Sequence, residues 1–400
     1  MQNRRLWAAA MSVMLLAGCG GTAAPTPAPQ TAGPPTAPSA TAASTLAASA
    51  ATATAATTTA PSAPASATQS VTPAPSGSHA PGTSRAPGTS TPPAGSAAPG
   101  ASEPASGTVA VADSAAVDPI SKAVAQLLAT TQPGVLVAFT QDQTFASFCA
   151  GSVVAYGADR KIRARGEADV CATNHVDYVE LEIALDAVAV VASAQGGTLS
   201  CLGLPDLYAL LGPESTGISN WKDAAAVASA LGSSTEYGDQ PLTVSGPAPD
   251  ADASQLLVAA AIAPLAAQRK RSAALRSDYA PVQGAAAVAR AVAAGGNGAI
   301  GWLPYGAVAS VASQVKALRI DAGDGCVAAT DDKIDAGTYP ISRALYLYVN
   351  IDDANADPAL VAFVNEYLAD GTLSGILQNL PYVPLPADAL AESVFAWQGR

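Results

Sequence analysis

The fold is decided by residues 139–171, which read FTQDQTFASFCAGSVVAYGADRKIRARGEADVC. This stretch opens at the end of a β-prone run, residues 134–140, and passes through a loop into a short helix that carries Phe145 and Phe148. A second strand is predicted at residues 152–156. A strand, a helix and another strand in this order are typical of an α/β unit with a parallel sheet.

The alternation of helices and strands continues along the rest of the chain. Helices are predicted from Pro119 to Leu128 and at residues 204–211, 224–231, 253–268, 282–293, 358–368 and 373–380, and strands at 108–112, 299–303 and 338–350. Residues 179–193 contain two β-rich runs that suit a buried sheet and a crossing between two lobes. Because residues 108–400 are too many for a single hydrophobic core, two α/β lobes with largely parallel sheets are expected.

The first 19 residues have the layout of an export signal. Two arginines are followed by an apolar run that is too short to span a bilayer. The run ends in Leu16-Ala17-Gly18-Cys19, which is similar to a bacterial lipobox. Lipidation of Cys19 would hold the protein on a membrane surface without a transmembrane helix. The alternative is an apolar helix with an incidental cysteine.

Residues 20–107 consist almost entirely of Ala, Pro, Thr, Ser and Gly and contain no aromatic residue. Such a segment has nothing with which to build a core. It is predicted to be a disordered tether with an end-to-end distance of roughly 50 Å, which would let the folded part stand away from its lipid.

The folded part is acidic. Without Arg4, Arg5, Arg85 and Glu103, the chain retains 16 basic and 30 acidic residues, a formal charge of −14. This balance argues against nucleic-acid binding.

Besides Cys19, the chain has four cysteines, Cys149, Cys171, Cys201 and Cys326. An even number in an exported chain favours two disulfides, and the residues alone leave three connectivities open. A zinc site is the alternative, but the cysteines lack a CxxC spacing and the folded part has one histidine.

An enzyme is poorly supported. A Ser/His/Asp hydrolase would have to use His175, which lies in the polar run Asn-His-Val-Asp with no nucleophile motif beside it. No catalytic residue is predicted.

Several runs, taken in order, resemble the phosphate-type periplasmic substrate-binding proteins of ABC transporters, the PstS-like family. The matching pieces are DSAAVDPI (113–120), FCAG (148–151), NHVDYVELEIALDAVAVV (174–191), CLGLPDLYALLGPES (201–215), GAIGW (298–302), GCVA (325–328), GTYPISRALYLYVN (337–350) and GILQNLPYVPLP (375–386). The resemblance covers nearly all of residues 108–400.

The resemblance implies the two-lobed periplasmic-binding-protein fold (type II), with crossing hinge strands and a ligand between the lobes. Residues 108–190 and 338–400 would form the first lobe, and residues 191–337 the second. The resemblance also implies two disulfide pairings, Cys149 with Cys171 and Cys201 with Cys326.

The function implied by the resemblance is capture of a small solute and its presentation to an ABC permease. The expected protein is a monomer without a cofactor, anchored by its lipid at the cell surface or on the periplasmic side of the membrane.

In this family, the anion is held by serine and threonine hydroxyls and by backbone N–H groups at helix amino termini. The family's first loop, Gly-Ser-Ser-Thr-Val, corresponds to residues 113–117, where Ser114 is retained and Asp113 replaces glycine. The glycine-rich turn corresponds to residues 141–144, which have lost the close backbone approach that glycine permits.

Two further motifs have also changed. The family's Ala-Ser-Arg corresponds to Ala158-Asp159-Arg160, and its Ser-Gly-Thr corresponds to Ala251, Asp252 and Ala253. By position, the candidate ligand-binding residues are Ser114, Asp142, Gln143, Thr144, Asp159, Asp252 and Ser254. Each lost hydrogen bond to a charged group costs about 1.5–3 kcal/mol, so the usual phosphate site is predicted to be largely lost.

Three alternatives stay open for this site. The aspartates could form an acidic site for a cationic solute or a metal ion, or they could lie on solvated loops of a site that has drifted. A misaligned loop would leave enough hydroxyls for phosphate. For the whole protein, the alternative is a surface lipoprotein outside transport that uses the same fold for sensing or protein interaction.

Overall fold

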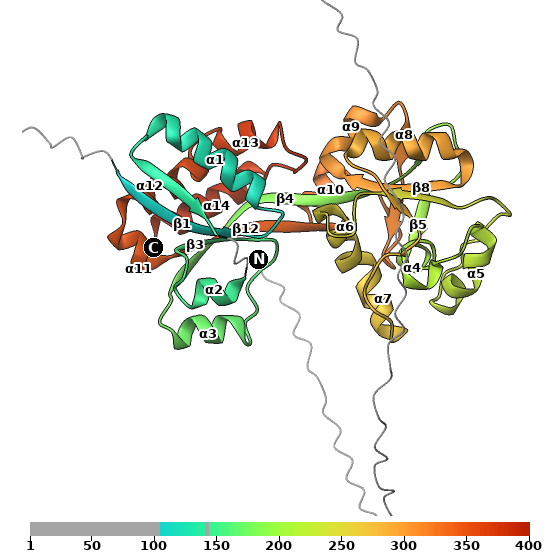
Figure 1. Ribbon diagram of the computed structural model, residues 1–400, viewed down its shortest axis with the longest axis horizontal. Coiled ribbons are helices and arrows are strands. Elements are labelled where there is room, and N and C mark those ends of the chain that lie inside the picture. Colours follow the sequence, from blue (N-terminus) through green and yellow to red (C-terminus); the bar gives the residue numbers. More distant parts are fainter. Residues whose placement is uncertain (1–104, 141–143) are drawn as a thin grey trace, which may run out of the picture. The chain divides into compact units, whose positions relative to one another are not determined.

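The computed structural model describes residues 105–140 and 144–400, which lie within one compact unit of the chain, Pro93–Arg400. The predicted signal peptide, Cys19 and most of the predicted tether lie outside the described residues. Helices and strands alternate through the described part (Figure 1). The prediction of an α/β fold is confirmed.

The first lobe is built on a parallel sheet. Strand β1 (Gly107–Asp113) lies between β2 (Val135–Phe139) and β3 (Ala155–Ala158) and is parallel to both. Successive side chains of a strand point to opposite faces. Val111 and Ala112 accordingly belong to different hydrophobic clusters, one on each side of the sheet.

Helices cover both faces of this sheet. The larger cluster receives side chains from α1 (Asp118–Thr131), α11 (Ile351–Ala356), α12 (Pro358–Leu368), α13 (Thr372–Leu377) and α14 (Ala387–Gln398). The smaller cluster receives them from α2 (Phe145–Cys149) and α3 (Glu167–Thr173). In α1, Ile120, Val124 and Leu128 recur at helical spacing and are fully buried.

Two long antiparallel strands, named here the crossing strands, connect the first lobe to the second (Figure 1). They are β4 (Tyr178–Ser193) and β12 (Ser342–Asn350). The residues of β4 are almost all buried, as expected for a strand covered on both faces. The register places Arg343 of β12 opposite Asp186 of β4.

The second lobe continues the same sheet. Strand β4 pairs with β8 (Ala299–Pro304), which pairs in turn with β6 (Thr243–Gly246), and β7 (Ala280–Pro281) follows. Strand β9 (Val315–Ala317) also pairs with β4. A separate sheet contains β5 (Cys201–Gly203), β10 (Arg319–Asp321) and β11 (Cys326–Val327).

The helices of the second lobe are α4 (Leu204–Leu211), α5 (Trp221–Ala230), α6 (Asp252–Leu257), α7 (Ala263–Gln268), α8 (Ala285–Gly295), α9 (Val308–Val311) and α10 (Asp331–Asp335). A π-helical segment, Val258–Ile262, joins α6 to α7. Trp221 and Trp302 are fully enclosed in the main cluster of this lobe, while Val288 and Val292 of α8 pack on the other face of the sheet.

The structure contains two disulfides, Cys149–Cys171 and Cys201–Cys326. These are the pairs that the family resemblance implied. The first joins α2 to α3, and the second joins β5 to β11.

Most predicted elements are present with shifted ends, and three differ in kind or place. The predicted strand at residues 152–156 is found at Ala155–Ala158, because a turn around Gly151, whose φ is +69°, occupies the preceding residues. The predicted helix at residues 253–268 is interrupted by the π-helical segment. The two β-rich runs within residues 179–193 form one continuous strand.

Among the residues described here, no helix is both long enough and apolar enough to cross a membrane.

Candidate functional site

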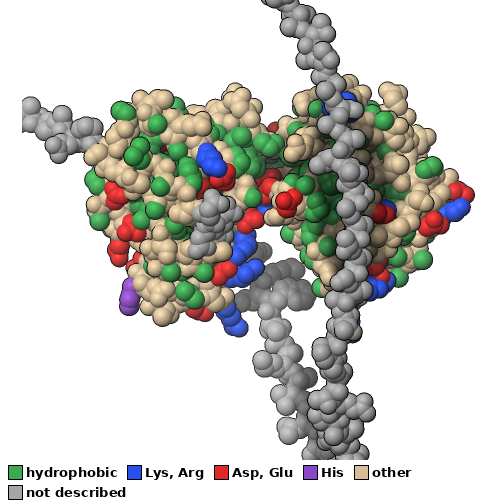
Figure 2. Space-filling model, viewed as in Figure 1, with side chains coloured by type: hydrophobic (Ala, Val, Ile, Leu, Met, Phe, Trp, Pro, Cys, Tyr) green, Lys and Arg blue, Asp and Glu red, His purple; other side chains and the backbone are tan. Residues whose placement is uncertain are grey.

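The centre of the candidate site is a guanidinium surrounded by three carboxylates, named here the Arg343 cluster. Arg343 donates from Nε to Asp186 at 3.0 Å, from Nη1 to Asp159 at 2.6 Å, and from Nη2 to Asp252. The Arg343 side chain is 14% exposed. On the face shown in Figure 2, acidic side chains gather near the crossing strands.

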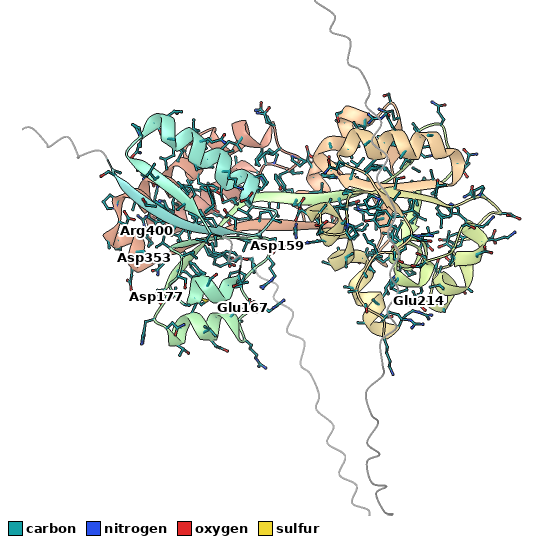
Figure 3. All side chains as sticks on the ribbon, in the orientation of Figure 1. Asp159, Glu167, Asp177, Glu214, Asp353 and Arg400 are labelled. Atoms are coloured by element: carbon teal, nitrogen blue, oxygen red, sulfur yellow. A yellow bond between two sulfur atoms is a disulfide. The ribbon has the colours of Figure 1, made fainter. Side chains whose placement is uncertain are left out.

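The fold brings these four side chains together from three places. Arg343 and Asp186 are directly opposed on the crossing strands. Asp159 directly follows β3 at the edge of the first lobe (Figure 3). Asp252 is the first residue of α6 in the second lobe. The cluster therefore joins the crossing strands to both lobes.

The cluster carries more negative than positive groups. Burial raises the pKa of Asp186 to about 7, although Arg343 opposes this, and the nearby Asp252 carboxylate raises it further. Burial acts to lower the pKa of Arg343, but the three carboxylates outweigh it and the pKa is raised. Arg343 thus stays charged, and its donors are directed at carboxylates of the chain itself.

A cavity of about 420 Å³, named here the hinge cavity, lies against this cluster. Asp186 and Asp252 line it, together with a wall that includes Pro247, Pro304 and Tyr382. Pockets of this size, mostly apolar with a few polar groups, are typical of small-molecule sites.

A second group of polar atoms lies where β1 and β2 end in the first lobe. Asp113 Oδ2, Ser114 Oγ and Thr140 Oγ1 are buried and have no hydrogen-bond partner among the residues described. The other Asp113 oxygen accepts from Ser121 Oγ at 2.9 Å. Burial raises the pKa of Asp113 to about 7 despite this hydrogen bond. Ligands of open α/β sheets bind at such carboxyl ends of strands.

Gly157 is required beside Asp113. A Cβ atom at position 157 would lie 2.0 Å from Asp113 Oδ1 and 2.4 Å from a methyl carbon of Val117. Because that contact is closer than any real Cβ makes, the buried carboxyl depends on glycine in the neighbouring strand β3.

The polar groups near α3 stabilise the fold of the first lobe. Arg160 donates to both oxygens of Glu167, at 2.8 and 2.7 Å, and lies 4.9 Å from the ring centroid of Phe145. The hydrogen bonds from Arg160 hold the pKa of Glu167 at about 2. A bidentate pair that also stacks on an aromatic ring fixes the loop between β3 and α3.

Comparison with models of protein families shows to which family the chain belongs. A family model described as a PBP superfamily domain matches residues 98–370. The chain belongs to the PBP superfamily.

Similar proteins include Protein SphX from Synechocystis sp., which is 28% identical to this chain over 288 residues, covering 70% of this chain and 80% of SphX. A possible phosphate binding protein from Planctomyces limnophilus shares 24% identity, with a TM-score of 0.63 over 74% of this chain and 99% of that one. PstS from Borrelia burgdorferi shares 15% identity, with a TM-score of 0.52 over 70% and 99% of the two chains. At these identities, the two structures show the likeness of fold.

The PBP domain brings together two of the residues predicted from the sequence, Asp159 and Asp252, at the Arg343 cluster. Ser114 directly follows β1 and donates its backbone N–H to the carbonyl of Gly157 at 2.7 Å, two residues before Asp159. Asp142 and Gln143 lie outside the described residues.

The remaining two predicted residues have local roles. Thr144 is the N-cap of α2 and accepts from the backbone N–H of Ser147. Ser254 is fully buried, donates to the carbonyl of Pro247 and accepts from Trp302 Nε1 at 3.0 Å. The hydroxyl of Ser254 is therefore engaged inside the second lobe of the PBP domain.

Sequence reasoning missed Arg343, Asp186 and Thr140. The first two carried a signal that could have been used: Arg343 is the one charged residue of the predicted strand 338–350, and Asp186 lies between apolar residues within the run 179–193 that was predicted to cross between lobes. A buried charge in a strand needs a partner, and the partner strand supplies it. Thr140 would have needed the observation that it directly follows a strand of the parallel sheet.

Proposed function

We propose that the chain is an extracytoplasmic solute-binding lipoprotein of the phosphate type in which the usual phosphate-binding residues are largely lost. A signal peptide over residues 1–19 would direct export, Cys19 would carry the lipid, and residues 20–107 would form the tether. The first lobe would comprise residues 108–190 and 338–400, and the second residues 191–337.

Function would consist of binding without catalysis. A solute enters between the lobes, the lobes close about the crossing strands, and the closed monomer presents the solute to an ABC permease. Membership of the PBP superfamily and the continuity of β4 and β12 between the lobes support this mechanism.

The Arg343 cluster is the observation that carries the loss of phosphate binding. An anion site needs donors that are free to face the anion. Here each donor edge of Arg343 faces a carboxylate of the chain, and two of these carboxylates, Asp159 and Asp252, stand at positions where the resemblance implies serine or glycine. Three carboxylates beside one guanidinium would repel phosphate.

The second candidate function is a surface lipoprotein outside transport, which uses the fold for sensing or protein interaction. One observation favours it. Arg343 already connects Asp159 of the first lobe with Asp252 of the second, so the chain itself supplies a contact of the kind a bound solute would make. This candidate needs neither a small ligand nor lobe closure.

The test is calorimetric titration with phosphate of protein that has been unfolded and refolded to remove carried ligand. No heat is expected at millimolar phosphate. Binding in the micromolar range would overturn the proposed loss. The double variant Asp159→Ser with Asp252→Ser restores the hydroxyl at position 159, adds one at position 252 and removes two of the three carboxylates that occupy the donors of Arg343. It is expected to bind phosphate measurably.

A matched control for the double variant changes the same charge elsewhere. Asp177 and Asp388 are exposed and lie outside the Arg343 cluster, and Asp177 is labelled beside α3 in Figure 3. Asp177→Ser with Asp388→Ser is expected to bind no phosphate. If this control variant also bound phosphate, the binding by the Asp159/Asp252 double variant would be due to the change in net charge and not to the Arg343 cluster.

A further inference from the structure

The hinge cavity has the composition of a site for a molecule with an apolar body. Its volume is about 420 Å³, and its wall includes Pro247, Ala251, Pro304, Pro381 and Tyr382. These residues come from three separate places in the fold: the loop before α6, the end of β8 and the turn after α13. Rigid apolar walls and a small polar end are typical of sites for organic solutes.

The polar end of the hinge cavity consists of the Asp186 and Asp252 carboxyl groups. Asp186 is 2% exposed, and both groups share the single guanidinium of Arg343 with Asp159. One positive charge therefore faces three acids. Two acids in close contact cannot both ionise without a further positive charge beside them, either a proton or a cation.

We propose that the hinge cavity binds the protonated amine of a small organic cation, with the ammonium group at Asp186 and Asp252 and the apolar body against the proline, alanine and tyrosine wall. This inference rests on the proposed function, because it names the class of solute captured between the lobes. The ammonium would supply the second positive charge that the cluster lacks.

Other ligand classes fit the cavity less well. An anion would meet the excess of carboxylates. A neutral molecule would cover Asp186 and Asp252 without adding a positive charge. For a bare metal ion, the described part of the chain offers no group of three or more His, Cys, Asp or Glu arranged to hold one. A cation with an apolar body matches both the charge and the wall.

The experiment compares three probes of one shape and different charge: benzylamine, benzyl alcohol and benzoate. Each is titrated calorimetrically into the full chain, after refolding, near neutral pH. Benzylamine is expected to bind at least about tenfold more tightly than benzyl alcohol, since a hydrogen bond to a charged group adds at least about one power of ten in affinity. Benzoate is expected not to bind.

Variants locate the effect. Asp252→Asn and Asp186→Asn keep the shape of the side chain and remove one charge, so each is expected to reduce benzylamine affinity about tenfold or more while changing benzyl alcohol little. Asp250→Asn is the matched control. Asp250 lies on the same loop but is exposed and does not line the cavity, and its replacement is expected to leave benzylamine affinity unchanged.

Three results would overturn the inference: equal affinity for the amine and the alcohol, no benzylamine binding at millimolar concentration, or an equal loss in all three variants. The phosphate titration separates this failure from that of the proposed function. Absence of both phosphate and benzylamine binding removes only the cation inference, whereas tight phosphate binding removes the proposed loss of the phosphate site.

Discussion

Asp113 is a buried acid whose protonation affects the stability of the first lobe. Burial raises its pKa to about 7 from an ordinary value of 3.8. Between these values, the folded chain holds a proton that the unfolded chain releases. Because the folded state then binds more protons, the stabilisation is complete below the unfolded pKa and is lost as the pH rises towards 7.

Replacement of Asp113 with Asn tests this directly, since Asn does not ionise. From about pH 5 to about pH 8, the free energy of unfolding of the wild type should fall relative to that of the variant by roughly 2–3 kcal/mol. Asp186 titrates in both proteins, so its contribution cancels. Urea unfolding at several pH values provides the measurement.

Asp177→Asn is the control for this prediction, because Asp177 is exposed. The difference in free energy of unfolding between Asp177→Asn and the wild type should stay constant over the same pH range. A constant difference for Asp113→Asn as well would contradict the assignment of a raised pKa to Asp113.

Single residues also show what the sequence could predict of the site. Asp159 and Asp252 were found because they stand at motif positions that can be aligned by order along the chain. Arg343 and Asp186 lie in matching runs to which the resemblance assigned no ligand position, and their meeting depends on the register of two strands that are far apart in sequence. Register is set by the packing of both faces, which local sequence patterns do not determine.

At the scale of elements, prediction succeeded where apolar periodicity was regular and failed at turns. Helices α4 and α12 have the predicted ends, Leu204–Leu211 and Pro358–Leu368. Strand β3 begins later than predicted, at Ala155, because the chain turns at Gly151 and Ser152 still donates its backbone N–H to the carbonyl of Ser147. The preceding helix α2 therefore determines where the strand can start, and β propensity does not.

The disulfide Cys201–Cys326 should stabilise the small sheet of the second lobe. It joins β5 to β11 and closes a loop with a sequence separation of 125 residues. Constraining so long a loop in the unfolded chain contributes about 3–5 kcal/mol. Cys201 is half-buried and Cys326 is exposed, so replacing both with serine removes little packing.

The double variant Cys201→Ser with Cys326→Ser is therefore expected to lose about 3–5 kcal/mol of unfolding free energy in urea. Its m-value should increase, because the unfolded chain without the link exposes more surface. An unchanged free energy of unfolding would show that the bond constrains the unfolded chain little.

At the scale of the whole described unit, one sheet runs through both lobes. The crossing strands β4 and β12 pair with β3 on the first-lobe side and with β8 on the second-lobe side. Unfolding of either lobe would break the pairing of strands that the other lobe also uses. The two lobes are therefore expected to unfold together in one cooperative transition.

Tryptophan positions allow a direct measurement of this coupling. Trp397 lies in the core of the first lobe, whereas Trp221 and Trp302 lie in that of the second. In a chain carrying Trp7→Phe, the variant Trp397→Phe reports on the second lobe, and Trp221→Phe with Trp302→Phe reports on the first. In each variant, the urea midpoint by fluorescence should equal the midpoint of the same variant by far-ultraviolet circular dichroism. Comparison within each variant removes the effect of the substitutions on stability, so a fluorescence midpoint that departs from the dichroism midpoint would show that the shared strands do not couple the lobes.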